Sequence, residues 1–331
     1  MNYVKTIALF LMAAAYGAAC FGQSKKWIVA ADGTGDYRTV QSALDAIPLH
    51  NKQPITVFIR SGLYREKLHL DSTKDKVELI GEDRFNTILT YDDHPGKVSP
   101  QGDSINTRSS YSFLVRGNDF SARNISFRND AGFAAGQAVA LEVRGDRAIF
   151  TDCLILGNQD ILFLNSENSR QYYSHCYIEG TTDFIFGAAT AWFYKCHIHS
   201  KKNSHVTAAS TPKDHPYGFV FYDCILTGDS SLHNASLGRP WRPYASVTYI
   251  YCYMDRHIRP EGWSNWNNTD SYKMSRYAEY KNYGPGADNS SRVPWSRQLT
   301  DEEARNYRVK NVLGGWDPES ETRHPGEPPN D

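Results

Sequence analysis

Two aspartates, Asp160 and Asp183, have the sequence settings that most suggest chemistry. Each lies seven residues after a cysteine, Cys153 or Cys176, so the acids are 23 residues apart in the stretches GNQDILF and TTDFIFG. If these stretches form neighbouring coils of one repeat, the two carboxyl groups lie about 5 Å apart. Carboxylates at that distance do not both ionise freely, so one becomes a general acid beside an ionised base or nucleophile.

The same two acids could instead serve only the backbone. Aspartate is common in turns, where its side chain accepts hydrogen bonds from nearby main-chain N–H groups. Aromatic residues follow both acids, however: Phe163 comes after Asp160, and Phe184 and Phe186 come after Asp183. A turn cap needs no such apolar wall, so the aromatic residues favour a catalytic pair.

The repeat that would align these acids is visible around the cysteines. Five of them are separated by 23, 20, 28 and 28 residues: Cys153, Cys176, Cys196, Cys224 and Cys252. The surrounding text also repeats as DCLI, HCYI, KCHI, DCIL and YCYM, and NISF at 124–127 is an earlier copy. A fixed period of roughly 20 to 30 residues indicates stacked units that each bury one face only against their neighbours.

The repeated units are expected to be strands. They are short, rich in β-branched and aromatic residues, and end at Gly, Asn or Asp. No stretch shows the long apolar stripe of a helical repeat, and the dense spacing of leucine-rich repeats is also absent. The sequence therefore predicts an all-β parallel β-helix in which the cysteines form an inward column of small apolar side chains.

The oxidation state of these cysteines stays open. An exported chain could form disulfides, and Cys176 with Cys196 is the favoured pair because adjacent coils hold side chains in register. Five is an odd number, however, and a register of this kind extends only to the next coil. Mostly reduced, buried thiols are therefore the expectation.

The N-terminal end differs from the repeats. Residues 39–47 (TVQSALDAI) have helical spacing and stop at Pro48, which predicts a short helix that caps the open end of the solenoid. Residues 1–22 resemble an export signal, with Lys5 before the apolar run 7–15 and small residues at 17–19. A lipoprotein box at Cys20 is less favoured because its usual leucine is missing. Export to the periplasm or the outside is expected.

The remaining boundaries follow from composition. Residues 318–331 are charged and proline-rich, so they are expected to be a disordered tail, which leaves 23–317 as one catalytic domain. No later segment is apolar enough to cross a membrane. The 331 residues carry 36 basic and 37 acidic side chains and no basic run, which argues against nucleic-acid binding. His197 and His199 share one strand face but lack a third ligand, so no metal is expected.

Five blocks of the chain resemble the pectin methylesterases, and they occur in the same order. They are GLYRE (62–66), QAVAL (137–141), QDIL (159–162), DFIFG (183–187) and LGRPW (237–241). With YAEY (277–280) and GPGA (284–287), the similarity covers roughly residues 27–316. It implies a right-handed, single-stranded parallel β-helix that needs no cofactor. The implied partner is methyl-esterified homogalacturonan (pectin), hydrolysed to pectate and methanol, and a monomer is expected.

The resemblance also implies a role for each polar residue. Asp183 matches the nucleophile, and Asp160 matches the general acid that later becomes the base. Gln137 and Gln159 match oxyanion donors, whose neutral amides stabilise a developing negative charge without neutralising the carboxylate. Arg239 matches the arginine that holds the nucleophile ionised and aimed. Without the motif, Gln137 would more often belong to the scaffold.

A second group of residues is implied to contact the sugar. Trp241 is expected to stack on a sugar ring, and Phe163, Phe186 and Trp263 are expected to line the cleft, although any of the latter three could belong to the core. Thr107 aligns with a substrate-contacting threonine by spacing alone. The family usually has a tyrosine at the place of Phe163, which leaves the chemistry intact but puts subsite preference in doubt.

Two other functions compete with an esterase. A β-helical pectate lyase would need an acidic calcium cluster, which the sequence lacks. A polygalacturonase would use two carboxylates on a glycosidic bond but has no evident need for paired glutamines. A non-catalytic carbohydrate-binding solenoid would not need the complete set of Asp160, Asp183, Gln137 and Arg239.

Overall fold

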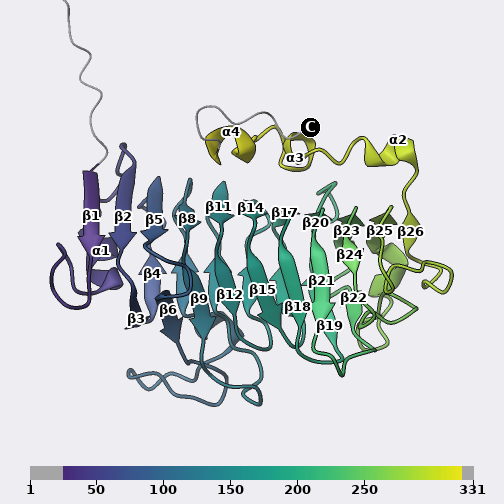
Figure 1. The fold of residues 1–331 in the computed structure, drawn as a ribbon, viewed down its shortest axis with the longest axis horizontal. Helices are drawn as coiled ribbons and strands as arrows, with labels where there is room; N and C mark the ends of the chain where they lie inside the picture. Colours follow the sequence, from purple (N-terminus) through teal and green to yellow (C-terminus); the bar gives the residue numbers. More distant parts are fainter. Residues whose placement is uncertain (1–24, 323–331) are drawn as a thin grey trace, which may run out of the picture.

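A computed structural model describes residues 25–322, which wind into one long prism of three parallel sheets (Figure 1). Sheet A has eleven strands: β1 (Lys25–Val29), β2 (Ile55–Ile59), β5 (Val77–Gly81), β8 (Ser121–Arg123), β11 (Ala148–Thr151), β14 (Arg170–Ser174), β17 (Thr190–Tyr194), β20 (Phe219–Tyr222), β23 (Ser246–Ile250), β25 (Arg276–Tyr280) and β26 (Arg297–Gln298). Each strand pairs in parallel with the next, as the repeat predicted.

The other two sheets complete each coil, because the chain passes from sheet A to sheet B and then to sheet C. Sheet B contains β3 (Gly62–Arg65), β6 (Thr87–Tyr91), β9 (Ser126–Asn129), β12 (Leu154–Leu156), β15 (Tyr177–Gly180), β18 (His197–Ser200), β21 (Ile225–Gly228) and β24 (Tyr253–Met254). Sheet C contains β4 (Leu68–Leu70), β7 (Phe113–Val115), β10 (Leu141–Val143), β13 (Leu162–Leu164), β16 (Ile185–Gly187), β19 (His205–Ala209) and β22 (Ser236–Gly238). The predicted parallel β-helix is confirmed.

The core of the prism consists of side chains that stack from coil to coil. Phe150, Tyr173, Phe193, Phe221 and Tyr249 form a column in which successive ring centroids are 5.0, 4.8, 4.5 and 4.5 Å apart. Residues at equivalent positions repeat their environment because the parallel register is kept from one coil to the next. The resulting core is continuous, and it fixes the height of every coil relative to its neighbours.

The five cysteines form a second inward column, as predicted. All five are buried free thiols, so no Cys176–Cys196 disulfide is present. Each Sγ donates to a main-chain carbonyl of sheet A in the coil before it, over 3.4 to 3.6 Å: Cys153 to Ala122, Cys176 to Phe150, Cys196 to Tyr173, Cys224 to Phe193 and Cys252 to Phe221. The period in the sequence therefore reflects a repeated thiol–carbonyl contact.

The predicted N-terminal helix is also confirmed. Helix α1 (Val40–Ala46) begins after Thr39, whose side chain accepts from the N–H of Ser42. The carboxylate of Glu66 accepts from the N–H groups of Val40 and Gln41, both at 2.9 Å. Free N–H groups at a helix start favour such a carboxylate. Figure 1 shows α1 at the end of the solenoid beside β1, where it covers the first coil.

The C-terminal segment corrects one prediction. Helices α2 (Asp301–Ala304), α3 (Val309–Val312) and α4 (Pro318–Thr322) run back across the outer face of sheet A (Figure 1). The expected disordered tail was therefore wrong for residues 318–322. Val312, Leu313 and Trp316 pack on an apolar stripe of sheet A, and the indole N–H of Trp316 donates to Glu321 at 2.8 Å, which holds α4 in place.

Several expectations concern residues that the structure does not describe. The predicted signal peptide (1–22), Cys20 and residues 323–331 lie outside the described range. Within residues 25–322, no helix is long and apolar enough to span a bilayer.

Two short 3₁₀ helices, η1 (Thr107–Ser109) and η2 (Ser271–Met274), lie in loops.

Candidate active site

A cleft of about 500 Å³ lies over sheet C and brings together nine of the ten residues predicted to form the site. Its lining residues come from seven segments of the chain and are Asn106, Thr107, Arg108, Gln137, Gln159, Asp160, Phe163, Asp183, Phe186, Ala208, Arg239, Trp241 and Trp266. Asn106, Arg108, Ala208 and Trp266 were not predicted. The tenth predicted residue, Trp263, lies elsewhere.

Both acids occupy equivalent turns between sheet B and sheet C. Asp160 lies between β12 and β13, and Asp183 lies between β15 and β16. The N–H of Asp160 donates to the carbonyl of Thr182 at 3.1 Å, so the two turns are stacked on each other. Both backbones are left-handed, with φ of 59° at Asp160 and 49° at Asp183. Aspartate tolerates this conformation better than most residues, and the equal geometry places both carboxyl groups in one cleft.

Arg239 holds Asp183 through both carboxylate oxygens. Its Nε donates to Oδ1 at 3.0 Å and its Nη2 donates to Oδ2 at 2.6 Å. The two side chains are only 16% and 7% exposed, so the pair is largely shielded from water. A planar guanidinium in this two-point arrangement fixes both the charge and the direction of a carboxylate. The ring of Trp266 supports Arg239, because the guanidinium carbon lies 4.0 Å from its centroid.

The two carboxyl groups differ in their electrostatic setting. Burial raises the pKa of Asp160 well above its usual value, and the nearby charge of Asp183 raises it further. Burial also raises the pKa of Asp183, but there the hydrogen bonds and charge of Arg239 act in the opposite direction. Because the guanidinium contacts Asp183 directly, the shared proton is favoured on Asp160. The two carboxyl groups are therefore unequal, because the pKa of Asp160 is raised further than that of Asp183.

Two glutamines lie beside the acids on consecutive coils. Gln137 and Gln159 form a parallel bridge, in which the N–H of Ala138 donates to the carbonyl of Gln159 at 3.0 Å. The side-chain amide of Gln159 lowers the pKa of the adjacent Asp160 and so partly opposes the effect of burial. The side-chain amide of Gln137 makes no hydrogen bond to another residue in the described part of the chain, so its two donors face the cleft unused.

An aromatic wall forms one side of the cleft. The rings of Phe163 and Phe186 stack with centroids 4.2 Å apart and planes at 11°, and Trp241 tilts against Phe186 at 6.0 Å. Phe163 and Phe186 are 2% and 4% exposed, so they form the buried part of this wall. Trp241 is more exposed and borders the opening. This arrangement offers an apolar surface beside the two acids.

Trp263 does not line the cleft, which corrects the prediction for that residue. It is fully buried, its ring centroid lies 4.4 Å from that of Tyr277, and its indole N–H donates to Glu279 at 3.1 Å. A parallel bridge to Gly238 continues sheet C at this height and turns the side chain into the core. Trp266, three residues later, lines the cleft instead of Trp263. Its setting in the polar run SNWNNTD is the signal that could have identified it.

The unpredicted rim residues come from a long loop between β6 and β7. Asn106 caps η1 by accepting from the N–H groups of Arg108 and Ser109 at 2.9 and 3.2 Å. This cap fixes Thr107, which lines the cleft as expected, and it places the exposed Arg108 at the rim. The edge of the cleft therefore carries a positive charge.

The two strand histidines have ordinary partners. Nε2 of His197 and Nδ1 of His199 lie 2.7 and 2.8 Å from the hydroxyl of Thr227, and Nε2 of His199 lies 3.1 Å from Asp229. Within residues 25–322, no three His, Cys, Asp or Glu side chains are grouped so that they could hold a metal ion.

The known proteins that this chain resembles in sequence and fold are pectinesterases. A family model described as Pectinesterase matches residues 26–316. Pectinesterase 31 of Arabidopsis thaliana is 40% identical over 284 residues, which cover 84% of this chain and 89% of that protein. The carrot pectin methylesterase structure superposes with a TM-score of 0.82 at 33% identity, covering 90% of this chain and 96% of that chain.

A second solved structure is a pectin methylesterase in complex with a hexasaccharide, with a TM-score of 0.79, 28% identity, and coverage of 89% of this chain and 99% of that chain. These likenesses support the right-handed, single-stranded form of the β-helix. The family model spans nearly the whole described chain, and the relatives are matched over most of their own length. The chain therefore belongs to the pectinesterase family, whose members are carboxylic ester hydrolases.

Proposed function

We propose that the cleft hydrolyses methyl esters of galacturonate units in homogalacturonan, with Asp183 as nucleophile and Asp160 as general acid and base. The observation that carries this proposal is the two-point contact of Arg239 with Asp183 beside an acid whose pKa is raised. A carboxylate held in this way stays ionised and correctly oriented in a site that contains little water. Its neighbour keeps a proton to donate.

The first step forms a covalent intermediate. An oxygen of Asp183 attacks the ester carbonyl, and the electron pair of the C=O bond moves to the oxygen. When that oxyanion collapses, the bond to the methoxy group breaks, and Asp160 protonates the leaving oxygen to give methanol. Asp183 is then joined to the galacturonate carbonyl as a mixed anhydride, and Asp160 is ionised.

The second step restores the enzyme. Ionised Asp160 takes a proton from water, whose oxygen attacks the galacturonate carbonyl of the anhydride. Collapse of this second tetrahedral state releases Asp183 as a carboxylate and the product as a galacturonic acid, while Asp160 keeps the proton. In both tetrahedral states the negative oxygen needs donors, and the free amide of Gln137, assisted by Gln159, is suited to this task.

Methanol release is the assay that tests the proposed function. The purified chain should liberate methanol from methylated galacturonan and leave the chain length of the polymer unchanged. Shortened chains without methanol would favour a polygalacturonase, and unsaturated products would favour a lyase. Binding without any turnover would make the protein a carbohydrate-binding solenoid.

Trp241→Ala should raise KM for methylated galacturonan about tenfold, with a smaller effect on kcat. The partly exposed indole borders the cleft, and its loss removes a stacking surface for a sugar ring worth about 1 kcal/mol or more. Steady-state kinetics with a melting curve measure both effects. An unchanged KM with a lower Tm would make Trp241 a packing residue instead.

Chelation should leave the activity unchanged. The nucleophile, the acid and the oxyanion donors are all supplied by side chains, so no step requires a Lewis acid. Rates of methanol release before and after dialysis against EDTA provide the measurement. Activity that is lost on dialysis and restored by calcium or zinc would contradict the proposed mechanism.

The pH profile of kcat/KM should be bell-shaped. Activity should rise with pH as Asp183 ionises, and fall as Asp160 loses the proton that the leaving group needs. Burial raises both pKa values, so both limbs should lie above the usual range of aspartate. In Arg239→Gln, the opposing effect of the guanidinium is lost, so the acidic limb of the residual activity should move to higher pH. An unmoved acidic limb would show that Asp183 is not the group that must ionise.

We also propose that the protein is exported and acts as a monomer. The N-terminal signal pattern supports export, because the proposed polymer substrate is a cell-wall material that does not enter cells intact. Mass spectrometry of the mature N-terminus tests the cleavage, and light scattering tests the monomer.

A further inference from the structure

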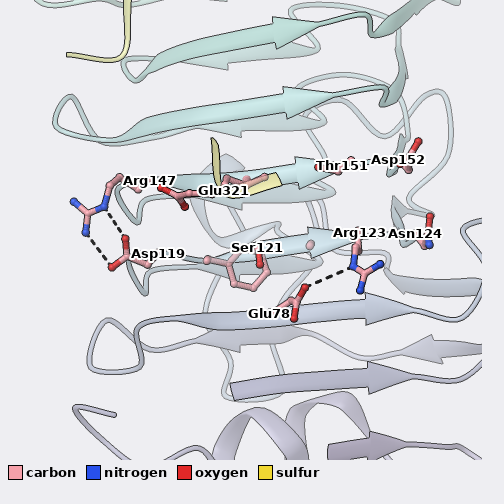
Figure 2. A pocket seen from close by; sticks show the side chains of 12 residues that line it. Glu78, Asp119, Ser121, Arg123, Asn124, Arg147, Thr151, Asp152 and Glu321 are labelled. Atoms are coloured by element: carbon pink, nitrogen blue, oxygen red, sulfur yellow. Dashed lines mark hydrogen bonds and ion pairs between the residues drawn. The ribbon is translucent and has the colours of Figure 1, made fainter. Parts of the chain in front are cut away.

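The outer face of sheet A, under the C-terminal helices, contains two pockets that are separate from the catalytic cleft. The first is shown in Figure 2, and its charged side chains pair with one another. Arg147 contacts both carboxylate oxygens of Asp119 at 2.6 and 2.9 Å, and Arg123 lies 3.6 Å from Glu78. These contacts satisfy the guanidinium groups within the protein, so this pocket offers a ligand little.

The second pocket, of about 500 Å³, has a different character. It lies between β17, β20 and the segment around α3, and its lining residues are Trp192, Tyr194, Tyr222, Tyr307, Arg308, Val309 and Glu319. Four of the seven are aromatic. None of them lines the catalytic cleft, which lies over sheet C, so this pocket opens on another face of the prism.

The aromatic residues form a row across successive coils. The rings of Trp192 and Tyr222 stack with centroids 5.2 Å apart and planes at 23°, and Tyr194 lies 6.3 Å from Tyr222. The row continues to Tyr251, whose centroid is 5.5 Å from that of Tyr222 and which is 38% exposed. The partly exposed members of this row, Tyr194, Tyr222 and Tyr251, can take the apolar faces of sugars, since each ring is a large and rigid contact surface.

The polar groups of this pocket differ in what they offer a ligand. Trp192 is only 3% exposed, and its buried indole Nε1 has no acceptor within the described residues. That nitrogen has almost no accessible surface, so a ligand cannot reach it in this conformation. Arg308 is exposed and makes no ion pair with another residue in the range 25–322, which leaves its guanidinium free for a carboxylate.

A further cation stands beside the row. The ammonium group of Lys195 lies 5.0 Å from the ring centroid of Tyr194 and 4.0 Å from the carboxylate of the partly buried Asp223. Glu319 adds one carboxylate to the lining of the pocket. Partly exposed aromatic rings beside Arg308, a cation without an ion pair to another residue in 25–322, match a chain of uronic sugars, some of them esterified and some bearing free carboxylates.

We propose that Tyr194, Tyr222, Tyr251, Tyr307 and Arg308 form a second binding site for galacturonan, on a face away from the cleft. The choice of polymer rests on the proposed function. A long chain held at this site keeps other stretches of the same or a neighbouring chain near the cleft, so the apparent affinity for polymer rises without any new contact at the acids. A short oligosaccharide gains nothing from the second site, because it cannot reach both.

The test compares long and short substrates in Tyr222→Ala and Arg308→Ala. Binding is measured in the Asp183→Asn background, which does not consume the polymer, by affinity electrophoresis in methylated galacturonan. Each variant should weaken polymer retention by about tenfold, since linked sites raise avidity by about 10²-fold or more. With otherwise wild-type protein, kcat/KM for an esterified hexagalacturonate should not change. Tyr283→Ala is the matched control, because Tyr283 is 56% exposed on a different part of the surface and should leave both measurements unchanged.

Two results would overturn this site. Unchanged polymer retention in folded Arg308→Ala and Tyr222→Ala protein would show that the row binds no galacturonan. An equal loss of retention in a neutral glucan gel would show that the row is not selective for uronic sugars. Failure of the proposed function has a different signature, because the wild-type protein would then release no methanol from either polymer or hexamer.

Discussion

Asp183→Asn should reduce methanol release to background at every pH, a loss of roughly 10⁴-fold or more. The amide has nearly the same shape as the carboxylate, so the β-helix and the stacked turn at this position should be kept. It has no charge to attack an ester carbonyl, however, and it cannot form the two-point ion pair with Arg239. The initial rate of methanol release across the pH range measures the effect, and a melting curve checks the fold.

Asp160→Asn is the matched control for this experiment. It replaces the neighbouring acid by the same amide but leaves Asp183 and its contact with Arg239 intact. Methyl esters should turn over very slowly, because methoxide leaves poorly without a proton. Substantial methyl-ester turnover by both variants would mean that neither carboxyl group takes part in catalysis.

Gln137→Ala should lower kcat by about 10²-fold or more with little change in KM. The reason is that its amide donors, unused in the free enzyme, would be engaged only by the oxyanion. Steady-state kinetics on methylated galacturonan measure the change. Gln159→Ala provides the comparison. Because the Gln159 side chain lowers the pKa of Asp160, its loss should also move the alkaline limb of the pH profile upward. A wild-type kcat in folded Gln137→Ala protein would assign Gln137 to the scaffold.

The sequence predicted the coils because their chemistry repeats. Each cysteine of the column donates to a carbonyl of the preceding coil, so the same small side chain recurs in five successive coils at the turn from sheet A to sheet B. The equal offset of Asp160 and Asp183 from their cysteines then predicted two stacked turns, and the hydrogen bond from Asp160 to Thr182 shows that stacking. Because the register is parallel, residues one period apart in the sequence lie at equivalent positions on neighbouring coils.

The parts that were missed lie where this period is lost. Trp263 and Trp266 belong to a turn with no counterpart in other coils, so nothing in the repeat said which tryptophan would face inward. The rim residues Asn106 and Arg108 lie in a long loop whose path depends on one local cap. The position of the C-terminal helices depends on an apolar patch of sheet A and not on the composition of the helices themselves. Val312, Leu313 and Trp316 pack there against side chains that are far away in the sequence.

Asp183 as nucleophile and Asp160 as acid and base have different roles in the proposed mechanism, and a burst experiment tests this difference most directly. Asp160→Asn protein is mixed with a galacturonate ester whose leaving group departs without a proton, and the released group is followed in time while the protein is analysed by mass spectrometry. Acylation of Asp183 no longer needs an acid, so we expect a burst of about one equivalent per enzyme, slow turnover afterwards, and an adduct that maps to Asp183. The absence of a burst in Asp160→Asn, together with a burst in Asp183→Asn, would show that the two roles are reversed.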